Sequence, residues 1–316
     1  MRTDILTITL NPTVDFATSA PRVYPEHKLR CSHPHIDPGG GGINVARAIR
    51  MLEGQATALV AIGATTGAHL LQLLALEGVP TVAFQGPGET RQSMSVTDES
   101  TGEQFRFVMP GPSWSEADVE RGLVSIDQAA GDGTLVVLSG SQPPGVAKEF
   151  PSILADHIAG RGAQLIVDTS GPALFNLVSA PHESIFVLRM DSAEAEELAG
   201  RLLPERTDTA AFSESLVAKG VAKNIIVARG ADGSVLSNAE GSWHSVAPKI
   251  EVVSKVGAGD SFVGGFTLAA ARGKPLPDCL AYGVAAASAA CTTEGTRLCD
   301  KATTERLLAL CAVTKL

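Results

Sequence analysis

The most informative stretch of this chain reads Lys255-Val256-Gly257-Ala258-Gly259-Asp260-Ser261-Phe262, and an apolar, helix-compatible run follows it to Ala271. Glycines allow the backbone to turn so that several N–H groups point at one spot, and a helix start adds the positive end of its dipole. Such a turn can hold an anion. Asp260 lies at its edge, where a carboxylate can accept a proton from a substrate hydroxyl. An anion site beside a potential base is typical of phosphoryl transfer to an alcohol.

A second glycine cluster, Gly39-Gly40-Gly41-Gly42, precedes Ile43-Asn44 at the start of another predicted helix. Four glycines let the backbone approach a ligand closely, and the Asn44 amide offers both a donor and an acceptor. A flexible loop with Asn44 near the helix cap would give the same pattern, so the cluster alone does not decide. The chain has no Walker A phosphate loop, and neither cluster has the third glycine of the Rossmann G-x-G-x-x-G motif. A nucleotide must therefore be held in another way.

The composition limits both the core and the class of ligand. With 316 residues, 44% of them hydrophobic, the chain can form one large α/β domain or two domains. Aromatic residues make up only 4%, which argues against a stacking platform for single-stranded nucleic acid. The formal net charge of −9 disfavours a nucleic acid or an anionic membrane as a partner. We therefore expect small-molecule ligands, including anions that local cations and backbone amides can bind.

The cysteines and the first ten residues indicate where in the cell the protein is found. Five cysteines without a C-x-x-C pair favour reduced thiols over disulfides or a zinc site. Residues 1–10 lack the apolar core of a signal peptide, and no apolar run is long enough to span a bilayer. We expect a cytoplasmic protein.

Short apolar runs typical of buried strands alternate with helix-like runs along most of the chain. This alternation predicts an α/β fold with a doubly wound, mostly parallel sheet flanked by helices. Ligands should then bind at the carboxyl ends of the strands. The expected strands are 5–10, 56–62, 135–139, 165–168, 185–188 and 225–228, and the expected helices are 44–52, 68–77, 117–129, 151–159, 193–202, 212–218 and 303–313.

Two segments interrupt the alternation. Residues 13–37 contain three prolines, and residues 91–108 alternate around a turn at 98–103, as in a hairpin. We expect them to form a small β-sheet lid over the strand ends, with an exposed face that favours a homodimer. The predicted division is a large α/β domain for nucleotide and substrate (1–12, 38–89 and 109–316) and the lid (13–37 and 90–108).

Taken together, these features resemble the ribokinase superfamily of sugar kinases, also called the phosphofructokinase-B family, almost from end to end. Two signatures carry the resemblance, 38–46 (PGGGGINVA) and 256–262 (VGAGDSF), with support from 9–15 (TLNPTVD) and 139–145 (SGSQPPG). Within the family, residues 28–30, 90–92, 107–111 and 295–299 are most similar to the bacterial ATP-dependent 6-phosphofructokinase branch. Tagatose-6-phosphate kinase and 1-phosphofructokinase are the neighbouring branches. The resemblance implies the ribokinase-like fold.

The resemblance also assigns roles on the sugar side. It makes Asp260 the base, and the amides from Gly257 through Ala258 and Gly259 to Asp260 the anion hole for the transferred phosphoryl group. On sequence alone, Asp15 is as well explained as a turn-former after Pro12, and Arg91 as a solvated hairpin charge. By resemblance, sugar hydroxyls and the sugar phosphate are bound by Asp15, Lys28, Arg30, Gly40, Gly41, Asn44, Arg91 and Ser141.

On the nucleotide side, the resemblance implies ATP and Mg²⁺. Glu194 matches the family's N-x-x-E motif, which serves Mg²⁺ through water, whereas Asp191 replaces its Asn and also fits a capping box. The resemblance further implies K⁺ held by backbone carbonyls. The implied nucleotide-binding residues are Arg189, Asp191, Arg229, Gly230 and Gly233, and the K⁺ residues are Ser254, Val256, Ala290, Thr293 and Gly295.

The departures from the family pattern concentrate around the nucleotide. Arg189-Met190-Asp191 stands where the phosphofructokinase branch has Lys-Pro-Asn. The Ser or Thr that usually precedes the nucleotide-loop glycine is displaced at residues 228–229, and Lys255 replaces a Thr before the anion-hole signature.

The leading hypothesis is ATP-dependent phosphorylation of a ketohexose phosphate, foremost fructose 6-phosphate at its 1-hydroxyl in glycolysis, with tagatose-6-phosphate kinase or 1-phosphofructokinase activity as alternatives. The departures motivate a hypothesis of another class, a sugar-phosphate-binding regulatory protein with a weakened nucleotide site.

Overall fold

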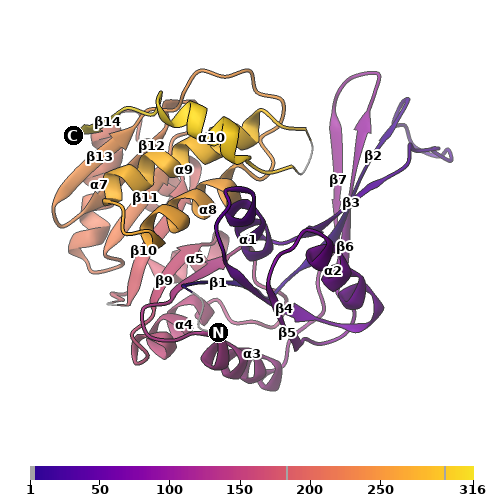
Figure 1. The fold of residues 1–316 in the computed structure, drawn as a ribbon, viewed down its shortest axis with the longest axis horizontal. Coiled ribbons are helices and arrows are strands. Elements are labelled where there is room, and N and C mark those ends of the chain that lie inside the picture. Colours follow the sequence, from indigo (N-terminus) through magenta and orange to yellow (C-terminus); the bar gives the residue numbers. More distant parts are fainter. Residues whose placement is uncertain (1–3, 183, 295–296) are drawn as a thin grey trace.

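A large, mostly parallel β-sheet forms the centre of the protein (Figure 1). The structure, a computed structural model, describes residues 4–182, 184–294 and 297–316. The strands from β11 through to β5 pair in parallel, and β12, β13 and β14 extend the sheet in antiparallel fashion. In spatial order the sheet consists of β14 (Val313–Lys315), β13 (Gly241–Ser245), β12 (Ser234–Asn238), β11 (Asn224–Ala228), β10 (Ile185–Asp191), β9 (Gln164–Asp168), β8 (Leu135–Ser139), β1 (Ile5–Thr9), β4 (Thr57–Ile62) and β5 (Thr81–Gln85).

Helices cover both faces of this sheet, which explains why its central strands read as continuous apolar runs. Every residue of β1 (ILTIT) and of β8 (LVVLS) is buried. One core lies under α1 (Gly41–Met51), α2 (Ala64–Leu76), α8 (Ala258–Ala271), α9 (Leu276–Cys291) and α10 (Lys301–Leu308). The other lies under α3 (Glu116–Ala129), α4 (Phe150–Ala159), α5 (Gly171–Leu177), α6 (Ser192–Ala199) and α7 (Arg206–Ala218). The predicted α/β fold, with its mostly parallel sheet between helices, is confirmed.

A separate four-stranded sheet protrudes from this body (Figure 1). Its order is β3 (His35–Gly39), β2 (Thr13–Ala20), β6 (Arg91–Asp98) and β7 (Gln104–Val108), and the last two form the expected hairpin. The predicted small second sheet is therefore present. Strand β3 continues through Pro38 and Gly39, which pair with Val14 and Thr13, so it runs past the boundary predicted after residue 37.

Several elements differ from the expectation, and each difference has a local cause. Helix α6 ends before Gly200, which adopts a left-handed conformation (φ 64°), and α7 begins at Arg206, after a capping box of Glu205 and Asp208. The last helix ends at Leu308, not at 313, because the chain turns back and Val313 pairs with Ser245. The elements that the pattern did not predict are β5, β12, β13, β14, α5 and α9.

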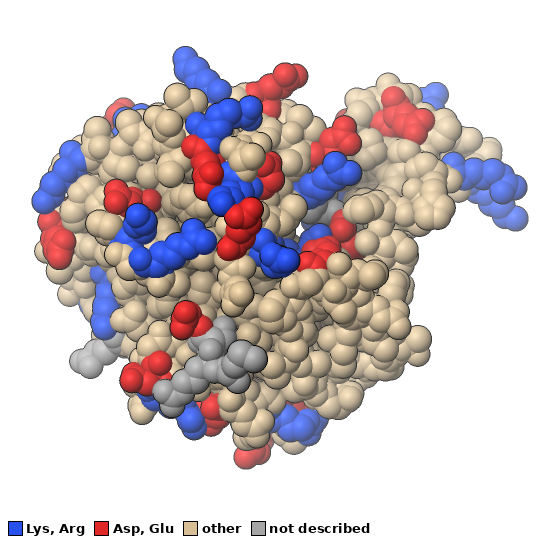
Figure 2. All heavy atoms as spheres, viewed as in Figure 1, with Lys and Arg blue, Asp and Glu red and all other residues tan. Residues whose placement is uncertain are grey.

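The surface carries charges of both signs side by side. Figure 2 shows Lys and Arg intermixed with Asp and Glu over the face that carries α8 to α10. In the described part of the chain, none of the helices combines the length and apolar character that a membrane-spanning segment needs.

Candidate active site

The first turn of α8 is built to receive an anion. Gly257 precedes it in a left-handed conformation (φ 74°), and a Cβ there would lie 2.5 Å from the Leu298 side chain, so glycine is required. Among the residues that the structure describes, no side chain caps this helix start. The N–H groups of the first turn are therefore available to a ligand, at the positive end of the helix dipole.

Asp260 lies within this first turn and faces the start of α1. Asn44 Nδ2 donates to Asp260 Oδ2 at 2.9 Å, and the Ser139 hydroxyl lies 3.5 Å from Oδ1. Burial, followed by the nearby Asp168 carboxylate, raises the pKa of Asp260 to about 6, although Asn44, Arg189 and Ser139 oppose the shift. A carboxylate with a pKa just below neutral is suited to general base catalysis.

A partly buried ion pair lies behind this carboxylate. Arg189 Nη1 donates to Asp168 Oδ1 at 2.7 Å, and the Arg189 guanidinium lies 5.6 Å from the centroid of the Phe262 ring. Asp168 ends β9, and Ser139, which ends β8, reaches it at 3.4 Å. Asp168 is not among the site residues predicted from the sequence. The signal was available, since a polar residue at the carboxyl end of a buried strand is where ligands bind in such sheets.

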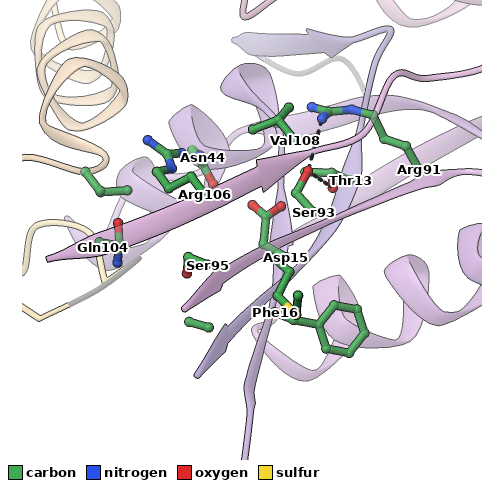
Figure 3. A pocket seen from close by; sticks show the side chains of 14 residues that line it. Thr13, Asp15, Phe16, Asn44, Arg91, Ser93, Ser95, Gln104, Arg106 and Val108 are labelled. Atoms are coloured by element: carbon green, nitrogen blue, oxygen red, sulfur yellow. Dashed lines mark hydrogen bonds between the residues drawn. The ribbon is translucent and has the colours of Figure 1, made fainter. Parts of the chain in front are cut away.

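A smaller cleft of about 190 Å³ lies between the small sheet and the starts of α1 and α8. Asp15 points into it (Figure 3), and burial raises the pKa of this carboxyl while Thr13, Arg91 and Arg106 oppose the shift. Arg91 Nη1 donates to Ser93 Oγ at 3.2 Å, and its Nε and Nη2 reach the Asn11 carbonyl. The cleft is lined by Thr13, Asp15, Phe16, Ala17, Gly40, Asn44, Arg91, Ser93, Met94, Ser95, Gln104, Arg106, Val108 and Val256.

The structure thus brings together Asp15, Gly40, Asn44 and Arg91, four of the predicted substrate residues. It adds Gln104 and Arg106, which the sequence reasoning had missed. Both belong to β7, where Arg106 is opposite Ser95 and Gln104 opposite Thr97, so they share the face of the hairpin that looks into the cleft. The alternating pattern of the hairpin places Gln104 and Arg106 on the same face, but the sequence does not show that this face lines the cleft.

The glycine cluster serves close packing rather than flexibility. A Cβ on Gly39 would lie 2.1 Å from Asp15 Oδ2, and one on Gly41 would lie 2.5 Å from Ser139 Oγ. Gly40 has a φ of 118°, which side-chain-bearing residues rarely adopt. Gly41 therefore packs against β8 and is not among the residues that line the smaller cleft, and its part in substrate binding stays a prediction.

A larger cleft of about 620 Å³ opens on the other side of the α8 start. Ala258 and Gly259 belong to its wall, whereas Val256 belongs to the smaller cleft, so the first turn of α8 separates the two. Apolar side chains such as Ile250, Phe262 and Val284 form much of its lining. Of the predicted nucleotide residues, it is lined by Arg189, Asp191, Gly230 and Gly233, and it also contains Lys255.

Arg229 does not take part in this cleft. Its guanidinium donates to Asp232 Oδ2 at 2.8 Å and to the carbonyls of Leu203 and Pro204 at 2.9 and 2.7 Å. Its side chain therefore holds the loop between α6 and α7 in place. Arg229 is not among the residues that line the larger cleft, and its assignment as a nucleotide-binding residue stays a prediction.

Three predicted sugar-phosphate residues lie outside the smaller cleft. Lys28 and Arg30 are exposed in the segment that connects β2 and β3, and neither lines the cleft of its own chain. Ser141 is exposed and joins the site indirectly, because Asn11 Nδ2 donates to its hydroxyl at 3.4 Å while the Asn11 carbonyl receives Arg91.

The predicted metal residues lie at two places. Glu194 forms the capping box of α6 with Asp191, in which Asp191 N donates to Glu194 Oε2 at 2.8 Å, and burial raises the Glu194 pKa. Two hydrogen bonds bring the residues predicted for K⁺ near one another. Ser254 N donates to the carbonyl of Cys291, which follows Ala290, and Thr293 Oγ1 donates to the Ala290 carbonyl. Gly295 lies outside the described residues. Over the described ranges, no group of three or more His, Cys, Asp or Glu could hold a metal ion.

Known proteins share much of this sequence. Residues 3–303 match the pfkB family of carbohydrate kinases. ATP-dependent 6-phosphofructokinase isozyme 2 of Escherichia coli K12 is 40% identical over 308 residues, 96% of this chain and 98% of that protein. The 1-phosphofructokinase of Bacillus subtilis is 29% identical over 290 residues, 92% of this chain and 93% of that protein.

Solved structures of E. coli phosphofructokinase-2 have the same fold. The complex with potassium gives a TM-score of 0.91 at 40% identity, covering 97% of this chain and 98% of that one. The complex with fructose-6-phosphate gives 0.89 at 39% identity, with the same coverage. A tetrameric inhibited form of that enzyme gives 0.89 at 39% identity, again covering 97% and 98%.

The raised pKa of Asp260 predicts a pH-dependent difference in stability between the parent and Asp260→Asn. The folded chain holds this proton up to a pH of about 6, whereas the ordinary value is 3.8, so the parent loses stability as the pH rises through this window. Above pH 7 we expect the variant to be more stable by about 1–3 kcal/mol, and the difference should shrink below pH 4, where both side chains are uncharged. Urea unfolding at several pH values measures it. A pH-independent difference would contradict the assigned pKa.

Proposed function

The chain belongs to the pfkB family of carbohydrate kinases, and on that premise we propose that it transfers the γ-phosphoryl group of ATP to the 1-hydroxyl of fructose 6-phosphate, forming fructose 1,6-bisphosphate in glycolysis. One observation carries the proposal. The Asp260 carboxylate, held by Asn44, lies at a helix start that separates a polar cleft from a larger, largely apolar one. An acceptor sugar in the first and a nucleotide in the second would meet at this carboxylate.

The residues of the smaller cleft suit a phosphorylated sugar. Asp15 can accept hydrogen bonds from sugar hydroxyls, and the guanidinium groups of Arg91 and Arg106 both lie close enough to lower the Asp15 pKa. Guanidinium groups bind phosphate in a bidentate manner, so one of them can receive the 6-phosphate while Asp15 and Asn44 hold hydroxyls. The higher identity to a 6-phosphofructokinase than to a 1-phosphofructokinase favours fructose 6-phosphate over fructose 1-phosphate.

The residues of the larger cleft suit ATP with Mg²⁺. Arg189 Nε is buried without a hydrogen-bond partner in the described part of the chain, which is costly unless a ligand receives it. Asp191, which lines this cleft, and its capping-box partner Glu194 would hold Mg²⁺ through water, and the ion would neutralise charge on the nucleotide phosphates. We also propose K⁺ near Ser254 and Ala290.

The chain's own groups account for the remaining steps. Asp260 takes the proton of the 1-hydroxyl as the sugar oxygen bonds to the γ-phosphorus and the bond to the ADP oxygen breaks. The first-turn amides of α8 bind the charge that develops on the transferred group, and one such donor is typically worth ~3 kcal/mol in the transition state. Lys255 adds a positive charge on the nucleotide side.

Replacing the base tests the proposal. Asp260→Asn should lower kcat by about 10²–10⁴-fold, because the amide cannot accept the proton, while fructose 6-phosphate still binds. A coupled assay with fructose 6-phosphate, fructose 1-phosphate and tagatose 6-phosphate measures both rate and preference. Asp278→Asn, at an exposed first-turn acid of α9, is the matched control and should retain parent activity. Parent-like turnover by Asp260→Asn would refute the assignment, and a higher kcat/KM for another sugar would change the substrate.

The departures at residues 189–191 and at Lys255 favour the second candidate, a sugar-phosphate-binding regulatory protein. Calorimetric titration separates the two. For a kinase we expect saturable Mg-ATP binding with a Kd of about 1 μM to 1 mM, the usual range of KM values. Sugar-phosphate binding with no nucleotide binding would support the regulatory role instead.

We further propose that the segments 13–37 and 90–108 act as a lid and as the interface of a homodimer in the cytoplasm. Phe107 follows Arg106 along β7, so its side chain lies on the lid face that does not carry Arg106, and it is 48% exposed. Light scattering should give twice the chain mass, and Phe107→Asp should reduce it to the monomer mass, while Phe175→Asp on α5 should not. A monomeric parent would refute this interface, and a tetramer would require a second one.

A further inference from the structure

Arg47 is a buried cation, 6% exposed, one turn after Asn44 on α1. Its Nε and Nη2 donate to both carboxylate oxygens of Glu77 at 2.6 and 2.8 Å. Nη2 also reaches Asp37 Oδ1 at 3.2 Å, and Nη1 reaches the Pro38 carbonyl at 3.1 Å and Asn44 Oδ1 at 3.3 Å. All these partners are acceptors, as a guanidinium requires. The proposed mechanism makes no use of this residue.

The contact with Asn44 determines which way that amide points. A guanidinium has only donors, so the atom of Asn44 that faces Arg47 must be the carbonyl oxygen. The NH2 group then faces the opposite direction, where Nδ2 donates to Asp260 Oδ2 at 2.9 Å. With the amide reversed, an oxygen would face the carboxylate and repel it. Arg47 thus selects the one orientation of Asn44 that supports an ionised Asp260.

We propose that Arg47 is a positioning residue of the phosphoryl-transfer site, which fixes the Asn44 amide so that its NH2 group holds the Asp260 carboxylate. The proposal deepens the proposed function and rests on it. The side chains that face Asp260 from the other packed elements are Ser139 on β8, Asp168 on β9 and Arg189 on β10. Of these, Asp168 opposes the ionised form of Asp260, so the donor from Asn44 matters for keeping the base ionised.

The Arg47 guanidinium also stabilises strand β3 of the small sheet, through Asp37. Asp37 is buried (6% exposed) and is opposite Asp15 in the β2–β3 pair, and it raises the pKa of Asp15. Arg47 provides the buried positive charge next to Asp37, while His35 Nε2 lies 3.2 Å from the same carboxylate oxygen at the surface. One side chain therefore sets both Asn44 and the strand that pairs with the strand of Asp15.

A double-mutant cycle of Arg47→Met and Asn44→Ala tests the inference. Arg47→Met should lower kcat by at least about tenfold, the equivalent of one charge-assisted hydrogen bond, with an unchanged KM for ATP because the nucleotide occupies the other cleft. In the Asn44→Ala background the same change should cost less than about threefold, since the amide that Arg47 orients is gone. Equal losses in both backgrounds would overturn the inference.

Two further variants separate positioning from folding. Ile49→Ala removes a fully buried side chain from the same helix and should lower stability without changing kcat per folded molecule. If Arg47→Met fails to fold because Asp37 and Glu77 lose their cation, the triple variant with Asp37→Asn and Glu77→Gln removes those charges as well. A triple variant with parent kcat would refute the role of Arg47.

Sugar binding keeps this test apart from the test of the function. If the unmodified protein shows no turnover, the proposed kinase activity is refuted, but the coupling between Arg47 and Asn44 is not. The four proteins of the cycle can still be titrated with fructose 6-phosphate, because Asn44 lines the smaller cleft. Non-additive changes in Kd would support the Arg47–Asn44 coupling even then, and additive changes would refute it.

Discussion

The hydrogen bond from Asn44 to Asp260 joins two helix starts that lie 216 residues apart in the sequence. It forms only because α1 and α8 approach each other closely. A Cβ on Gly264 of α8 would lie 2.9 Å from the Ala48 Cβ and 3.2 Å from the Val45 carbonyl of α1. Each helix begins with a glycine at positive φ, Gly40 and Gly257, so backbone as well as side chains can face the space between them. The two clefts, the proposed base and the proposed anion site all depend on this contact.

Electrostatics in the site are local, and the net charge of −9 does not describe them. Asp260, Asp168 and Arg189 form a partly buried group in which burial and the Asp168 carboxylate raise the pKa of Asp260, while the Arg189 guanidinium and the Asn44 amide limit the rise. The balance places the pKa of Asp260 at about 6, where the ionised form predominates at neutral pH and can still accept a proton. An acidic protein can therefore bind anionic ligands through a few guanidinium groups and a helix start.

The small sheet and the large sheet contribute in different ways. The large sheet places Ser139, Asp168 and Arg189 at the ends of adjacent strands, which is the usual location of a site in a doubly wound fold. The small sheet supplies the polar face with Asp15, Arg91 and Arg106, and Arg47 connects its strand β3 to the helix of Asn44. The smaller cleft is thus formed by the small sheet and the starts of α1 and α8, and the larger cleft belongs to the body.

The sequence by itself determined the fold class and the centre of the site. Buried strands that alternate with helices can satisfy their backbone only in a layered sheet, and the glycine clusters identified Asn44 and Asp260 because close backbone approach needs glycine. Only the tertiary structure decided the partners of Asp168 and Arg229 and the position of Arg106, placed Lys28 and Arg30 outside the smaller cleft, and made β12, β13 and β14 an antiparallel extension. The physical reason is range: periodicity and turn residues encode local conformation and burial, whereas the partner of a charged side chain depends on which distant strands become neighbours.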